Sequence, residues 1–317
     1  MELKEIADNV YACLQEDKGF GWNNAGYINL GEGVIVDTLY DVKHTREMVE
    51  LIQKINPNLV KRIINTHHNG DHTWGNQLFK DREIIAHQYT AKYMEEEKKR
   101  NLPGLLQTSI KRPHRFPEGM KWFIDEINEF DFSDVEITLP NHLIEDNLTL
   151  ELDGFPCDII YVGPAHSAGD LIVNLPEHKV LFSGDIIFSK TTPLGWEGTH
   201  ENWIKALDLI KSLEPKVIVP GHGPLCDLKA VEELRDYFEF IYSEAKKYFD
   251  EGLSPLEASK MIDLGLYKNW NGTQRLIFNV NRAFREFEGT EPWDSPFNEI
   301  ELISKGHELR TFWEKED

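Results

Sequence analysis

The chain has 317 residues, 40% of them hydrophobic, and its 55 acidic residues outnumber the 34 basic ones, so the net charge is −21 at pH 7. This length suits one large domain with an extension, and the composition supplies enough apolar side chains for a substantial core. The charge argues against a nucleic-acid partner, because affinity for a phosphate backbone depends on basic surface. The one basic cluster, 111–115, is too short to supply it.

The cysteines and the N-terminal segment bear on location. The three cysteines are scattered and odd in number, which favours a reducing compartment over a disulfide framework. Residues 1–8 lack the charged and apolar parts of a secretory signal, and no stretch reaches membrane-spanning length. We therefore predict a cytoplasmic protein without a membrane partner.

The first part of the chain alternates short apolar runs with segments of helical periodicity. The expected strands are 9–14, 26–30, 34–37, 60–65 and 83–86. The expected helices are 42–55, 73–79 and 88–99. This alternation predicts an α/β fold.

The most informative stretch runs from Thr66 to His72 and holds three histidines, an asparagine and an aspartate at the end of an expected strand. Turns from strand to helix are where α/β proteins build their sites. Three later strand ends each add one similar residue, flanked by Gly or Pro: His166, Asp185 and His222. Imidazole and carboxylate ligands suit zinc, manganese or iron, and Asp185 could bridge two ions. The pattern predicts a catalytic metal site.

A long insertion, 101–140, is punctuated by Pro and Gly and rich in aromatic residues. Insertions of this kind are uncommon in compact domains and often form lids or binding loops. We favour a lid over the metal cleft, whose aromatic side chains would suit an apolar or mixed small-molecule substrate. The alternative is a helical patch that forms a homodimer.

The second half repeats the alternation and then becomes helical and charged. The expected strands are 147–152, 158–162, 171–174, 180–182 and 217–219, with a helix over 203–213. After 226 the expected helices are 228–249, one opened by a capping box at 254–257, and 274–287. The pattern gives no assignment for 298–317.

Together these motifs resemble the metallo-β-lactamase-fold hydrolases, whose H-x-H-x-D-H motif is followed by a lone His, a bridging Asp and a final His. The order and spacing match through most of residues 1–225. The resemblance implies a four-layer αββα sandwich over 1–226, followed by a helical extension over 227–317. It implies that one metal site uses His67 and His166, that a second uses Asp71, His72 and His222, and that Asp185 bridges them.

One position departs from the family motif: Asn69 stands where the second His is usual, and the additional histidine falls at His68. An amide oxygen is a poor zinc ligand beside imidazole but suits harder ions. Three states stay open: a dinuclear site with Asn69 as a weak ligand, a mononuclear site at Asp71, His72 and His222, or recruitment of His68. A related branch of the superfamily shows the same H-x-N-G-D-H motif, so we interpret Asn69 as a variant design.

Other residues receive supporting roles. Asp71 is expected to orient the attacking hydroxide or to accept its proton, and Asn69 or His68 to stabilise the oxyanion. Asp37, at the end of an early strand, and His87, at the end of a later one, are expected to hydrogen-bond to metal-bound histidines.

The predicted function is hydrolysis of an ester, thioester, lactone or amide of a small molecule by hydroxide formed at one or two Zn²⁺ ions, with Mn²⁺ or Fe²⁺ as alternatives. Three other functions stay open: an iron-dependent oxidoreductase of the sulfur dioxygenase type, a weak or promiscuous β-lactamase, and a non-catalytic metal-binding protein.

Overall fold

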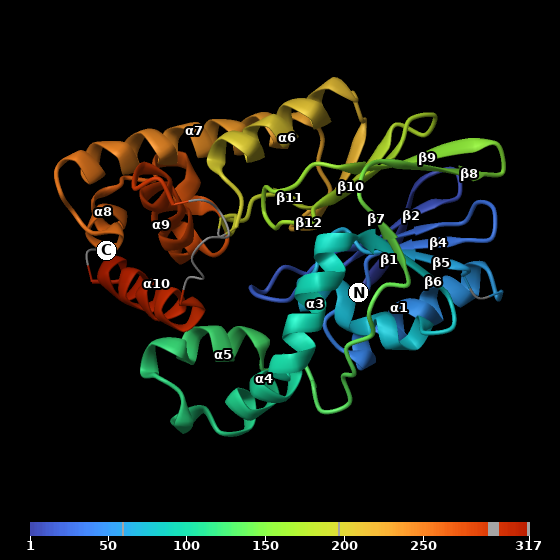
Figure 1. Cartoon of the computed structure of the whole chain (residues 1–317), viewed down its shortest axis with the longest axis horizontal. Coiled ribbons are helices and arrows are strands. Elements are labelled where there is room, and N and C mark those ends of the chain that lie inside the picture. The colour runs from blue at the N-terminus through green and yellow to red at the C-terminus, as the bar shows by residue number, and fades with distance from the viewer. Residues whose placement is uncertain (59, 196, 291–297, 316–317) are drawn as a thin grey trace.

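The computed structural model describes residues 1–58, 60–195, 197–290 and 298–315. Two β-sheets lie face to face between layers of helices, with α6 above β11 and β12, α7 to the left of α6, and α1 below the first sheet in Figure 1. The predicted αββα sandwich with a C-terminal helical extension is confirmed. Among the described residues, no helix is both long and apolar enough to cross a bilayer.

The first sheet has seven strands in the order of the chain. They are β1 (Glu2–Ala7), β2 (Val10–Leu14), β3 (Ala25–Ile28), β4 (Val34–Val36), β5 (Arg62–Ile64), β6 (Glu83–His87) and β7 (His142–Ile144). β1 to β4 pair antiparallel, whereas β4 to β7 pair parallel. The carboxyl ends of the parallel strands therefore meet at one edge of the sheet.

The second sheet has five strands in the order β12-β11-β10-β9-β8. They are β8 (Leu148–Leu152), β9 (Phe155–Tyr161), β10 (Leu171–Leu175), β11 (Val180–Phe188) and β12 (Val217–His222). Only β11 and β12 pair parallel, so their carboxyl ends also lie together.

Alternation along the strands fills two different cores. In β4, Val34 and Val36 pack into the layer between the sheets, whereas Ile35 packs toward α1. β5 divides its side chains the same way, with Ile64 between the sheets and Ile63 on the helical side.

The helices of the sandwich are α1 (Val42–Ile55), α2 (Gly70–Thr73), α3 (Gln88–Arg100) and α6 (His200–Ser212). The 3₁₀ helix η1 (Trp74–Phe79) continues α2. Asp41 caps α1 by accepting the His44 N–H at 2.8 Å, and α1 buries Met48 and Ile52 against the first sheet.

The insertion and the extension are both helical. The insertion contains α4 (Leu102–Lys111), α5 (Lys121–Ile127) and the 3₁₀ turns η2 (Pro113–Arg115) and η3 (Glu118–Met120). The extension contains α7 (Leu228–Asp250), α8 (Pro255–Met261), η4 (Gly265–Asn269), η5 (Thr273–Arg275), α9 (Leu276–Phe287) and α10 (Glu299–Trp313). The capping box at Ser254 and Glu257 is confirmed. No sequence pattern predicted α10, β1 or β7.

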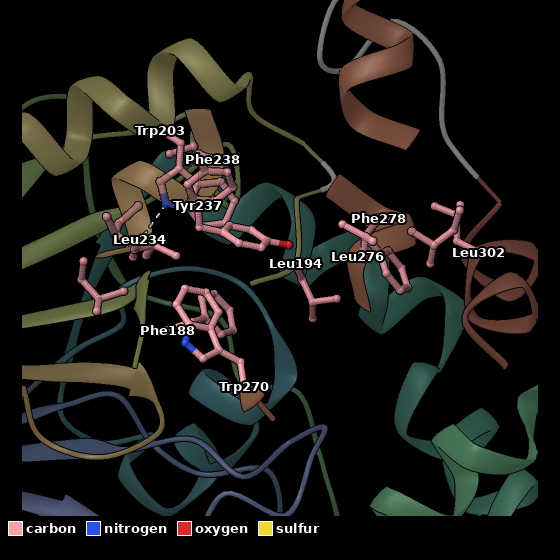
Figure 2. Close-up of a cluster of buried hydrophobic side chains, with 14 of the residues drawn as sticks. Phe188, Leu194, Trp203, Leu234, Tyr237, Phe238, Trp270, Leu276, Phe278 and Leu302 are labelled. Atoms are coloured by element: carbon pink, nitrogen blue, oxygen red, sulfur yellow. Dashed lines mark hydrogen bonds between the residues drawn. The ribbon is translucent and has the colours of Figure 1, made fainter. Parts of the chain in front are cut away.

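The extension is fused to the sandwich by a shared apolar cluster, part of which is drawn in Figure 2. Trp203 of α6 and Phe238 of α7 pack with their rings 4.6 Å apart, and Phe188 of β11 belongs to the same cluster. Burial of this many large side chains is worth roughly 2 kcal/mol for each one. We therefore expect the extension and the sandwich to unfold together.

Candidate metal centre

The motif loop leaves the carboxyl end of β5 and turns directly into α2. Gly70 begins this helix where a Cβ would lie 2.4 Å from the Trp74 ring, so only glycine fits. This turn aims His67, Asp71 and His72 toward the second sheet. Across the gap, His166 lies between β9 and β10, Asp185 lies within β11, and His222 ends β12.

The structure brings these side chains together in two groups that could each hold a cation. His67, His166 and Asp185 form one group, and Asp71, His72 and His222 form the other, with the ligand atoms of each group within 4.8 Å of one another. Asp185 Oδ2 is 3.4 Å from Nε2 of both His166 and His222, and so lies between the two groups.

Asn69 turns its amide toward the first group. Its Oδ1 is 3.0 Å from His67 Nε2 and 2.8 Å from His166 Nε2, whereas its Nδ2 lies 3.4 Å from His68 Nε2. His68 stays outside both groups and stacks on Tyr93 at 5.0 Å. Of the three states that the sequence left open, recruitment of His68 is the one that this geometry disfavours.

Each histidine of the second group is held through its other ring nitrogen. His72 Nδ1 is 2.9 Å from Asp37 Oδ2, and His222 Nδ1 is 3.2 Å from the Trp22 carbonyl oxygen. The Asp37 carboxylate also accepts hydrogen bonds from the Thr66 N–H and hydroxyl, both at 2.7 Å. Contacts of this kind fix the tautomer and the orientation of a metal-binding imidazole.

The same holds in the first group, but His87 takes no part. His166 Nδ1 is 3.0 Å from the Leu194 carbonyl oxygen. His87 caps α3, contacts the Glu145 carbonyl oxygen at 3.1 Å and stacks on Tyr161 at 4.0 Å. None of these contacts reaches a candidate ligand, so the expected role of His87 in orienting one has no contact behind it.

Burial and charge separate the histidines. Burial lowers the pKa of His68 to about 3, so this ring is neutral. Burial also opposes charge on His222, but the carboxylates of Asp185 and Asp71 outweigh it and raise its pKa to about 9. The same two carboxylates, with Asp37, raise the pKa of His72 well above its usual value despite burial. The centre attracts positive charge strongly.

Two atoms at the centre lack the partners that burial demands. His72 Nε2 and Asp185 Oδ1 are buried 3.1 Å apart, and neither makes a hydrogen bond of acceptable geometry. Buried polar atoms are rarely left unsatisfied, because each one costs about 1–3 kcal/mol. Imidazole nitrogens and carboxylate oxygens converging in this way suit a divalent zinc, manganese or iron ion. The residues therefore fit the group that the motif implies.

Two glycines allow close approach around Asp185, Gly221 to its carboxylate and Gly184 to the motif loop. A Cβ at Gly221 would lie 2.0 Å from Asp185 Oδ1. Gly184 has a φ of +48°, and a Cβ there would lie 2.5 Å from Thr66 Oγ1. The β11–β12 pair and the motif loop can therefore approach closely enough to share one carboxylate.

The metal centre opens into a cavity of about 720 Å³. Its lining from the sandwich includes Tyr40, Trp74, Phe188, Leu194 and Glu197, and its lining from α3 includes Tyr89, Lys92, Tyr93, Glu96, Glu97 and Arg100. The insertion adds Leu102, Leu106 and Phe123, and the extension adds Arg275, Glu299 and Ile303.

Two acidic side chains of this lining are strongly perturbed. Burial raises the pKa of Glu97 and of Glu197 to about 8 each. Glu97 accepts the Trp74 Nε1–H at 3.2 Å, and Glu197 accepts the Ala168 N–H. The sequence analysis missed both. The spacing of Tyr89, Tyr93, Glu96 or Glu97, and Arg100 along one helix face was the available signal for the α3 part of the lining.

An αββα sandwich that brings these histidines and aspartates together is the arrangement that the sequence motif implies. A family model of the metallo-beta-lactamase superfamily matches residues 19–222, and the chain belongs to this superfamily. Several of the similar proteins are named as hydrolases.

Among curated relatives, the linear primary-alkylsulfatase of Pseudomonas sp. (strain ATCC 19151) is 24% identical over 255 residues, which are 73% of this chain and 48% of that protein. The metallo-beta-lactamase type 2 of Bacteroides fragilis is 30% identical over 116 residues, or 35% of this chain and 47% of that one. The chain thus spans about half the length of these relatives.

Among solved structures, the inverting sec-alkylsulfatase Pisa1 from Pseudomonas sp. matches with a TM-score of 0.69 at 17% identity, covering 93% of this chain and 52% of that one. The metallo-beta-lactamase from Pontibacter korlensis matches with a TM-score of 0.56 at 18% identity, covering 75% of this chain and 98% of that one. These likenesses show the fold. The alkylsulfatase shares more of it than the lactamase does.

Proposed function

We propose that this protein is a metal-dependent hydrolase that cleaves an ester, thioester, lactone or amide bond of a small molecule with an apolar portion. The observation that carries the proposal is the convergence of six candidate ligands, two of whose buried atoms lack partners, beside a cavity of about 720 Å³. The alkylsulfatase relatives add a sulfate ester to the bonds worth testing.

Divalent ions held by these ligands would act as Lewis acids and lower the pKa of water. Asp71 also lines the cavity, so its carboxylate can hold the attacking water and accept its proton. His68 is neutral, lines the same cavity and has no partner at Nδ1 among the described residues. Its N–H can donate to the oxyanion that forms on the substrate.

The cavity wall supports an apolar portion in the substrate. Trp74, Tyr93, Phe123 and Phe188 belong to its lining, and aromatic side chains in a pocket suit an apolar part of a small molecule. Because Leu106 and Phe123 of the insertion line the cavity, we infer that 101–140 acts as a lid. We place the homodimer patch second.

The test joins metal content to turnover. We expect one or two zinc or manganese ions per chain after purification without chelators, and hydrolysis of at least one member of a panel of aryl esters, thioesters, lactones, amides and sulfate esters. Asp71→Ala should abolish turnover, whereas His114→Ala, at an exposed position of η2, should not change it. Turnover that survives Asp71→Ala or chelation would refute the proposal.

Asn69→His separates the two occupancy states. If Asn69 is a weak ligand in a dinuclear site, the natural protein holds two ions and the variant also holds two. If the site is mononuclear at Asp71, His72 and His222, the natural protein holds one ion and the variant gains a second.

A second candidate function has one observation in its favour. The first group offers two imidazole nitrogens with oxygens from Asn69 and Asp185, a set that also suits ferrous iron. An iron-dependent oxidoreductase would show iron in elemental analysis and would consume oxygen with a thiol or persulfide substrate. Zinc content without oxygen consumption would remove this candidate.

A further inference from the structure

Arg275 is among the largest fully buried side chains of the described residues, with 1% of its surface exposed. It ends η5, directly before α9, and its side chain lines the cavity that adjoins the metal centre. Arginine keeps its charge in proteins, so its N–H groups need acceptors wherever it is buried.

The described residues supply few such acceptors. Arg275 Nε is buried without a hydrogen-bond partner, and Nη2 is 3.9 Å from Glu126 Oε2, which is longer than a hydrogen bond. Glu126 Oε2 already accepts the Phe20 N–H at 2.9 Å, and burial raises the pKa of this carboxyl group. Glu126 is therefore an incomplete counter-ion for Arg275.

The surroundings hold the guanidinium in one orientation. Its central carbon lies 4.6 Å from the centroid of the Phe20 ring, and Phe20 packs edge-on against Phe123 at 4.9 Å. A guanidinium stacked on a ring leaves its in-plane N–H bonds for another acceptor. Gly272 has a φ of +67°, and a Cβ there would lie 2.9 Å from Arg275 Nε. The side chain is thus fixed before any ligand arrives.

We propose that Arg275 anchors an anionic oxygen group of the substrate, a carboxylate or a sulfate, on the side of the cavity formed by the C-terminal extension. The proposal rests on the proposed function in taking this ligand to be the hydrolysed molecule or its product. Both groups can present two oxygens to the planar N–H fork of arginine and supply the charge that Glu126 supplies only in part.

Arg100 provides a matched control within the same cavity. It also lines the cavity, but its side chain is 59% exposed and its Nη1 lies 3.7 Å from Glu299. Because this side chain is largely exposed, solvent can satisfy its N–H groups without a ligand, so its removal should have little effect on anion binding.

The experiment is isothermal titration calorimetry of the metal-loaded protein with hexanoate, hexyl sulfate and hexanol. At least one anion should bind about tenfold more tightly than hexanol to the natural protein and to Arg100→Gln, and Arg275→Gln should lose this preference. Arg275→Lys should keep part of it, because lysine retains the charge without the fork. The preference should persist after chelation, which separates it from anion binding to the metals.

Equal binding of anions and hexanol to the natural protein would overturn the inference, as would an unchanged preference in folded Arg275→Gln. A purely structural Arg275 would lower the melting temperature of that variant and leave the preference intact. If Arg275→Gln does not fold, the anion preference of the natural protein is compared with that of Arg275→Lys, and an equal preference in both would overturn the inference. Arg275-dependent anion binding without hydrolysis of any panel substrate would refute the proposed function alone, and hydrolysis without anion preference would refute this inference alone.

Discussion

The floor and the wall of the cavity are built in different ways. The floor consists of the candidate ligands in the loop after β5 and in α2, within β11, at the end of β12 and in the loop before β10. The wall consists of cavity-lining side chains from α3, α4, α5, η5 and α10, which are far apart in the sequence. The strands and their loops therefore position the candidate ligands. The surrounding helices can vary in sequence without moving these ligands, and can so set which substrates fit.

The largest expected effect lies in the floor. Asp185→Asn removes the charge of the one carboxylate that lies between both groups. We expect the variant to lose bound metal and about 10³-fold in kcat/KM, since a bound ion contributes several kcal/mol. Elemental analysis beside steady-state kinetics checks this. Full metal content with normal turnover in this variant would show that the floor does not control metal binding and activity.

Asp37 tests how far the floor extends beyond the ligands. Asp37→Asn should weaken metal binding about 10- to 100-fold, because the hydrogen bond to His72 Nδ1 loses its charged acceptor. Competition with a chromogenic chelator measures this affinity. Asp158→Asn, at a strand position in β9 that contacts Thr149, is the control and should bind metal normally.

Protonation of Glu97, in the wall, should make the stability of the protein depend on pH. Burial raises its pKa from 4.5 to about 8, so in this window the folded state holds a proton that the unfolded state releases. The stability of the natural protein should therefore fall as pH rises through the window, and Glu97→Gln should lack this loss. Urea unfolding at about pH 5 and about pH 9 should show the variant gaining roughly 2 kcal/mol relative to the natural protein at the higher pH. A difference in unfolding free energy between the variant and the natural protein that stays the same at both pH values would contradict this prediction.

The smallest expected effect concerns the insertion. Phe123→Ala should raise KM about tenfold for substrates with long apolar chains and leave kcat nearly unchanged, because the contact is equal in ground and transition states. Leu105→Ala, on the exposed side of α4, should change neither constant. A drop in kcat alone for Phe123→Ala would place this side chain in the chemistry instead of the wall.

The candidate ligands of the floor could be selected from the sequence because their signals are local. Histidines and aspartates beside Gly or Pro at the ends of apolar runs indicate ligands near strand ends. The order of these runs predicts the αββα sandwich. The positions of Asn69 and His68 could not be predicted, because the direction of an amide depends on partners such as His166, 97 residues away.

The wall was not predicted from the sequence because its residues come together only through tertiary packing. Arg275 and Glu97 are ordinary charged residues in sequence, and their burial depends on tertiary neighbours such as Phe20 and Trp74. β1 is half-exposed and carries charged residues, so its pattern was too weak to identify. α10 is placed by its packing against η3 and α9, which no local pattern reports.

Gly221 carries a consequence for how this protein can change. It offers no functional group, yet any side chain there would occupy the position of Asp185 Oδ1, 2.0 Å from the first added carbon. In a saturation library we expect this position to accept glycine alone, while neighbouring helices accept many substitutions. New substrate specificities would then arise from substitutions in the wall, while Gly221 stays unchanged.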